Sequence, residues 1–127
     1  MNCGDTFLMP LRKYGVKAHL WIVVTEPEAN GKCIIVNVTT LRHSWQDNTV
    51  VLQKGDHSFI QGPTFVRFSD AQFANVNRLL EIVECGSARA KQPCSAPVLR
   101  RVQDGLLTST STQNDVREYC ERIWGRR

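Results

Sequence analysis

Two apolar runs in the first third of the chain, HLWIVVT (residues 19–25) and CIIVNVTT (residues 33–40), decide the fold. They are separated by EPEANG (residues 26–31), a cluster of turn-forming residues. β-Branched and aromatic residues on both sides of such a cluster predict two antiparallel strands joined as a hairpin. Both runs are apolar at nearly every position, which is typical of central strands that are covered on two faces.

Shorter strand-like segments lie on either side of this hairpin. Residues 5–9 form an apolar run that stops at Pro10, and residues 49–52 form another. The segment 64–68 alternates between apolar and polar positions, as a half-buried strand does, and residues 72–76 are expected to continue the sheet after a bend. The first three-fifths of the chain therefore predicts one antiparallel sheet.

The C-terminal part predicts helices. Ser95 is a good N-cap, Pro97 falls in the first turn, and the apolar positions that follow share one face. Thr112, with Asp115 three residues later, has the pattern of a capping box for a second helix that runs through Trp124. We expect a single domain over residues 1–127, mainly β, with a small barrel-like antiparallel sheet over about residues 4–84 and helices over about residues 95–124.

Composition excludes several classes of protein. The 127 residues carry a net charge of +4 at pH 7, which is compatible with a polyanionic partner. The longest mostly apolar stretch without charge, residues 20–25, is far shorter than the ~20 residues of a membrane span, and the N-terminus lacks the pattern of a secretory signal. Five cysteines without a CxxC pair indicate reduced thiols. We expect a soluble, cytoplasmic protein without a membrane segment.

Several short motifs occur along the chain in a characteristic order. They are GDTFL (residues 4–8) with Pro10, the run at 19–24, VNVTT (residues 36–40) and FVRFSDAQFANVNRL (residues 65–79). In this order they resemble the PemK/MazF-like toxins of bacterial toxin–antitoxin systems. The resemblance implies an SH3-like barrel that cleaves single-stranded RNA without a metal, forms a homodimer and is neutralised by a cognate antitoxin.

The resemblance also implies where the chemistry lies. In the family, an arginine at the start of the second strand and a threonine or serine at the end of the third carry it. These positions correspond here to His19 and Thr40, with Thr39 as the alternative if the register differs by one residue. Because His19 stands where the family has arginine, the groups for cleavage have to be sought among this chain's own residues.

Metal-free RNA cleavage requires a base for the 2′-hydroxyl proton, an acid for the departing 5′-oxygen and a donor to the phosphorane. Imidazole titrates nearest neutral pH and can fill either proton-transfer role. Antiparallel pairing of the hairpin puts His19 and Thr40 at the same open end. We therefore predict His19 as general base and His57 as general acid, with Asp56 orienting an imidazole and Thr40 bonded to the phosphate. The alternative is that residues 55–57 form a structural turn.

The predicted RNA contacts combine cations, a hydroxyl, a carboxylate and one aromatic ring. They are Thr39, Arg42, Trp45, Lys54, Asp56 and Arg67. Trp45 is either a stacking platform for an unpaired base or a lid on the core. The mid-strand Cys33 is expected to be a buried, inert thiol.

No cofactor is predicted. The three histidines lack the spacing of a metal site, and the chain has no GxSxG, P-loop or GxGxxG motif. A second interpretation keeps the barrel but assigns it only a binding function, with RNA or a protein as partner and no catalysis.

Overall fold

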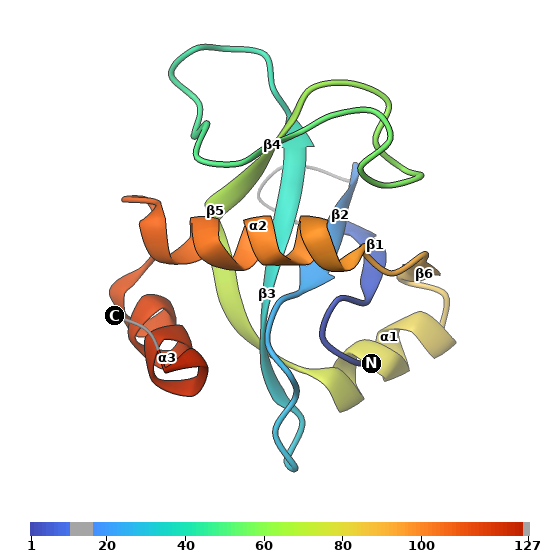
Figure 1. Cartoon of the computed structure of the whole chain (residues 1–127). Helices are drawn as coiled ribbons and strands as arrows, with labels where there is room; N and C mark the ends of the chain where they lie inside the picture. Colours follow the sequence, from blue (N-terminus) through green and yellow to red (C-terminus); the bar gives the residue numbers. More distant parts are fainter. Residues whose placement is uncertain (11–16, 126–127) are drawn as a thin grey trace.

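The computed structural model describes residues 1–10 and 17–125, which contain one sheet and three helices (Figure 1). The strands are β1 (Thr6–Pro10), β2 (Ala18–Val23), β3 (Lys32–Thr40), β4 (Val51–Leu52), β5 (Thr64–Asn75) and β6 (Arg89–Lys91). The helices are α1 (Val76–Glu84), α2 (Ala96–Thr108) and α3 (Asn114–Trp124). The six strands are antiparallel in the order β4-β5-β3-β2-β1-β6 and form a curled half-barrel, followed by the C-terminal helices. The predicted fold class is confirmed.

The β2–β3 hairpin lies at the centre of the sheet, as the sequence predicts. Its register pairs Leu20 with Val38 and Val23 with Ile35. Figure 1 shows the β2–β3 turn at one end of the sheet and the long loops before and after β4 at the other. The ends of β2 and β3 that carry His19 and Thr40 are therefore at the loop end.

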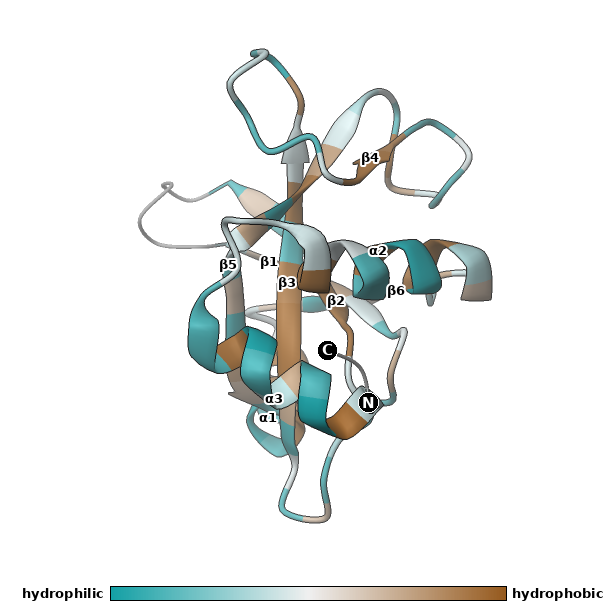
Figure 2. Ribbon diagram, turned by 60° about the vertical axis from the view of Figure 1, so that its left-hand side comes forward, coloured by the Kyte–Doolittle hydropathy of each residue, from teal (hydrophilic) through white to brown (hydrophobic). Residues whose placement is uncertain are grey.

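Both faces of the hairpin are buried, which explains why its strands are apolar at nearly every position. One face packs under α2 and α3, where Leu20, Ile22, Val36 and Val38 belong to the same core cluster as Val102 of α2. The other face packs against α1. Its cluster joins Trp21, Val23, Cys33 and Ile35 of the hairpin to Phe7 of the neighbouring strand β1 and to Val76 and Leu79 of α1. Figure 2 shows the apolar middle of β3 behind the mainly hydrophilic α3.

A bulge bends β5 where it pairs with β3. Ile35 pairs with Gln72 and Asn37 with Arg67, so Val36 alone on β3 faces residues 68–71 on β5. The extra residues let the long strand curl around the core. The expected bend before residue 72 is confirmed, and it turns Asp70 back toward β3, where Asn37 Nδ2 donates to its carboxylate at 3.0 Å.

The structure differs from the sequence prediction in several local features. Residues 76–84, assigned to the barrel, form helix α1, which Asn75 caps by accepting from the Asn77 amide. β6 was not expected, and the strand expected at 49–52 is only Val51–Leu52. The capping box is wrong: the Thr112 hydroxyl donates to the Leu106 carbonyl oxygen, and α3 starts without a side-chain cap. Among the described residues, no helix is long and apolar enough to cross a bilayer.

Gly105 is where α2 lies closest to the sheet. A Cβ atom at this position would meet Val50 and would lie 2.8 Å from the Phe68 ring. We predict that Gly105→Ala lowers the free energy of unfolding, because overpacking costs about 1–3 kcal/mol and exceeds the ~1 kcal/mol that alanine gains in a helix. Thermal unfolding measures this. Gly62→Ala is the control, since nothing lies within 4 Å of its added Cβ; equal melting temperatures for the two variants would contradict the close approach.

Candidate functional site

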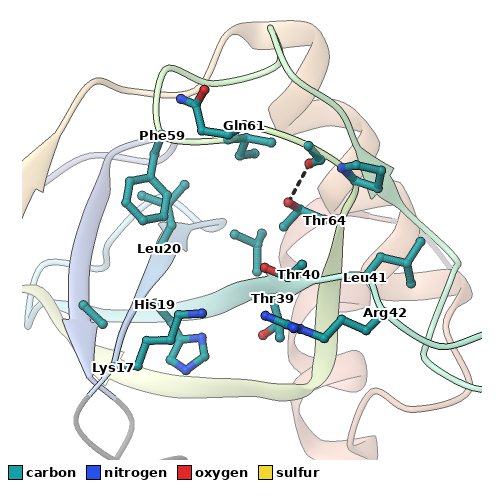
Figure 3. A pocket seen from close by; sticks show the side chains of 15 residues that line it. Lys17, His19, Leu20, Thr39, Thr40, Leu41, Arg42, Phe59, Gln61 and Thr64 are labelled. Atoms are coloured by element: carbon teal, nitrogen blue, oxygen red, sulfur yellow. Dashed lines mark hydrogen bonds between the residues drawn. The ribbon is translucent and has the colours of Figure 1, made fainter.

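A cleft opens at the loop end of the β2–β3 hairpin, with a volume of about 490 Å³ (Figure 3). Three segments build it: the start of β2 with the preceding Lys17, the end of β3 with the following Arg42, and the loop before β5. The polar groups in its lining are Lys17, His19, Thr39, Thr40, Arg42, Gln61 and Thr64. In Figure 3, Lys17 and His19 lie on one side, Arg42 extends in from the other, and Thr39 and Thr40 lie between them.

His19 is a buried imidazole in the wall of this cleft, with 8% of its surface exposed. Burial is the main cause that lowers its pKa, and the positive charges of Arg67 and Lys17 lower it further. Two influences raise the pKa of His19: its hydrogen bond with the Val38 backbone, and the negative charge of the Asp70 carboxylate. The net effect keeps His19 neutral at pH 7, the protonation state in which an imidazole can accept a proton.

The two threonines at the end of β3 face opposite sides of the sheet. Since Leu20 pairs with Val38, the same register continued by one residue sets His19 opposite Thr39 and gives their side chains one face. Thr39 is half-buried, and its Oγ1 accepts a hydrogen bond from Arg67 Nε at 3.4 Å. Thr40 is exposed, on the other face. The structure thus brings His19, Thr39, Thr40 and Arg42 to one cleft, with Arg67 beside Thr39.

The structure does not bring His57 and Asp56 to this cleft. They border a different depression together with Arg101 of α2, and Asp56 forms an ion pair with Arg101 at 3.5 Å. His57 is buried, with 6% exposed. Its Nδ1 accepts from the Phe59 amide at 3.0 Å, and its Nε2 lies 2.6 Å from the Gln92 carbonyl oxygen. This pattern of bonds is that of a structural histidine, and it favours the turn interpretation of residues 55–57.

Trp45 and Lys54 lie on the long loops, outside the cleft lining. Trp45 is 79% exposed and stacks on the His43 ring, with 5.0 Å between the ring centroids and 8° between the planes. The interpretation of Trp45 as a lid on the core is therefore wrong. Lys54 is exposed.

Sequence reasoning missed several residues of the site. Lys17, Phe59 and Gln61 line the cleft but stand in segments without a motif. Asn37 and Asp70 form a buried polar pair behind Thr39 and Arg67. The signal that could have revealed this pair is Asn37 itself, a polar residue inside an otherwise apolar strand.

Two further expectations concern reactive and metal-binding groups. Cys33 is fully buried, and burial raises the pKa of its thiol to about 11, as an inert thiol requires. In the part of the chain that the structure describes, no group of three or more His, Cys, Asp or Glu side chains could hold a metal ion.

Comparison with known proteins shows what this architecture resembles. No protein-family model matches the chain, and no curated protein matches its sequence. Two crystal structures of MazE–MazF from Deinococcus radiodurans are similar in fold. One gives a TM-score of 0.56 at 13% identity, over 89% of this chain and 98% of the other; the second gives 0.55 at 14%, over 89% and 97%. The chain has the MazF fold. The identity is low enough that this likeness concerns the fold alone.

The contacts of His57 predict that its removal destabilises the protein. His57→Ala leaves the Gln92 oxygen and the Phe59 amide without their buried partner, at a cost on the order of 2–4 kcal/mol. Chemical denaturation measures the loss, and the exposed His43 is the control, since His43→Ala should stay within about 0.5 kcal/mol of wild type. A His57→Ala protein as stable as wild type would instead mean that the imidazole is available for chemistry.

Proposed function

We propose that the protein is a toxin-like endoribonuclease that cleaves single-stranded RNA by metal-independent transphosphorylation. The observation that carries the proposal is the cleft of a MazF fold in which a buried imidazole with a lowered pKa, two threonine hydroxyls and basic side chains line one cavity. A neutral base beside hydroxyl donors and cations is the combination that this reaction requires.

In the proposed reaction, His19 takes the proton of the 2′-hydroxyl, and the 2′-oxygen attacks the adjacent phosphorus. The P–O5′ bond breaks, leaving a 2′,3′-cyclic phosphate on one product. A proton for the departing 5′-oxygen is available from the Lys17 ammonium, which lines the cleft beside His19. Thr39, on the same face of the sheet as His19, donates a hydrogen bond to the phosphate, and Arg42 neutralises its charge.

The surroundings of the cleft suggest how an RNA strand is held. Arg42 lies at the mouth, and the exposed Trp45 follows it on the same loop, stacked on His43. We propose Trp45 as a stacking platform for an unpaired base outside the cleft, with Lys54 as a contact to the RNA backbone. Asp56 is left out of the binding surface because it is paired with Arg101.

The proposed partners follow from the function. The similar structures are of MazE–MazF, which supports an antitoxin as the protein that blocks this cleft. We propose that the chain acts as a homodimer in the cytoplasm, where RNA is the substrate.

The test is cleavage of a long unstructured RNA by purified protein in excess chelator. Wild type should produce ends with 2′,3′-cyclic phosphate, and His19→Ala should lose about 100-fold or more of the rate, since a general base typically contributes roughly 10²–10⁴-fold. Arg78→Ala, on the exposed face of α1 and outside the cleft lining, is the control and should keep the activity.

Each result separates one part of the proposal. Equal cleavage by wild type and His19→Ala would remove His19 from the mechanism. No cleavage by wild type, together with salt-sensitive binding of the same RNA, would favour the alternative function of a barrel that binds without cutting. The observation that favours this alternative is that His19 is the one imidazole among the described residues that line the cleft.

A further inference from the structure

Arg67 of β5 is a cation held in a fixed orientation against Thr39, one of the residues that line the cleft. Its Nε donates to Thr39 Oγ1 at 3.4 Å and lies 3.7 Å from Asp70 Oδ2. Its guanidinium carbon lies over the buried Phe65 ring, 5.1 Å from the centroid. The Arg67 side chain is 23% exposed. A carboxylate, a hydroxyl and an aromatic face thus fix the guanidinium.

The carboxylate behind Arg67 is itself held in place. The Asp70 side chain is only 1% exposed, and it comes from the β5 bulge rather than from a regular strand position. Asn37, fully buried on β3, donates to Asp70 Oδ2 at 3.0 Å. Taking a carboxylate out of water is unfavourable, and pairing offsets this cost only in part, so an apolar pair of similar volume often gives equal stability. The advantage of the Asn37–Asp70 pair over an apolar pair is that it places a carboxylate at a defined position next to Arg67.

The position of that charge relates it to the groups proposed for catalysis. Thr39, which accepts from Arg67, lines the cleft together with His19 on the same face of the sheet. Arg67 is also close enough to His19 to lower the pKa of the imidazole. Arg42, in contrast, is exposed on the loop that follows β3. The two arginines therefore differ in preorganisation. The Arg67 guanidinium is already held in one orientation, whereas the exposed Arg42 side chain has to become ordered when RNA binds.

We propose that Arg67 is a catalytic residue that stabilises the negative charge of the phosphorane, and that Asp70, held by Asn37, is its positioning residue. This inference rests on the proposed function. As the 2′-oxygen bonds to phosphorus and the P–O5′ bond breaks, charge accumulates on the non-bridging oxygens, and the guanidinium donates hydrogen bonds to them. A donor that is already oriented requires no reorganisation in the transition state, so it contributes to the rate more than to RNA binding.

The experiment separates the rate of the chemical step from affinity. Single-turnover cleavage of a short labelled RNA is measured in chelator, at saturating protein, for wild type and for Arg67→Gln, Arg67→Lys and Asp70→Asn. The Kd is measured with the same oligonucleotide carrying a 2′-deoxy sugar at the cleaved position. Arg42→Gln is a comparison for binding, and Arg78→Gln, on the exposed face of α1, is a control for loss of one positive charge.

We expect Arg67→Gln to lose about 100-fold or more in rate, the loss typical of removing one transition-state donor, with Kd changed less than about threefold. Arg67→Lys keeps the charge without the planar fork and should still lose at least about tenfold. Asp70→Asn should lose rate without losing affinity. Arg42→Gln should mainly weaken binding.

The pH–rate profile supplies a readout that a merely structural role would not move. Lys17 and Arg67 lower the pKa of His19, and Asp70 raises it. Removing the Arg67 charge should therefore shift the acid limb of the profile to higher pH, and Asp70→Asn should shift it to lower pH. Opposite shifts from two neighbouring residues do not follow from a general loss of folding.

Several outcomes would overturn the inference. These are an Arg67→Gln rate within threefold of wild type, a parallel loss of rate and affinity, or full activity in Arg67→Lys. If Arg67→Gln does not fold, the cleavage rate and Kd of Arg67→Lys and Asp70→Asn provide the test: both variants should lose rate without losing affinity. An inactive wild type would refute the proposed function and this inference with it, a result distinct from inactivity confined to the variants.

Discussion

The structure depends on one hairpin whose two strands are buried on both faces. Helices α2 and α3 cover one face, and α1 covers the other. Such strands can carry polar groups that reach solvent only where the covering layers stop. On β2 and β3 this happens at the loop end, where the apolar run gives way to His19, Thr39 and Thr40. The site therefore lies where the core ends.

The buried polar pair behind the site follows from the same constraint. Asn37 is fully enclosed in β3, so a polar partner has to come from the neighbouring strand. The β5 bulge supplies Asp70, and Asp70 is paired with Arg67. One irregularity in strand pairing thus connects the interior of the sheet to a cation at the cleft. The residue expected at the start of β2 by resemblance to the PemK/MazF-like toxins is an arginine, and in this chain a guanidinium reaches the same region from β5.

The sequence predicted correctly those features that depend on residues close together in the chain. The hairpin, the Ser95 cap of α2 and the joint position of His19 and Thr40 follow from periodicity, turn residues and antiparallel pairing. Helix α1 was missed because it follows β5 directly, with only the Asn75 cap to signal it. The setting of His57 could not be predicted, since its partners Thr6 and Gln92 are 51 and 35 residues away in the chain. Asp70 depends on a bulge that no local pattern reveals.

The central claim is that the cleft at the loop end of the hairpin is where RNA binds and reacts. The most direct test is the change in backbone amide NMR signals when a short 2′-O-methyl RNA, which cannot be cleaved, is added to the protein. The account predicts that the largest changes fall on residues 17–20, 38–42 and 59–64, which line the cleft. Changes confined to α3, or centred on the depression that contains His57, would place the binding surface elsewhere and contradict the account.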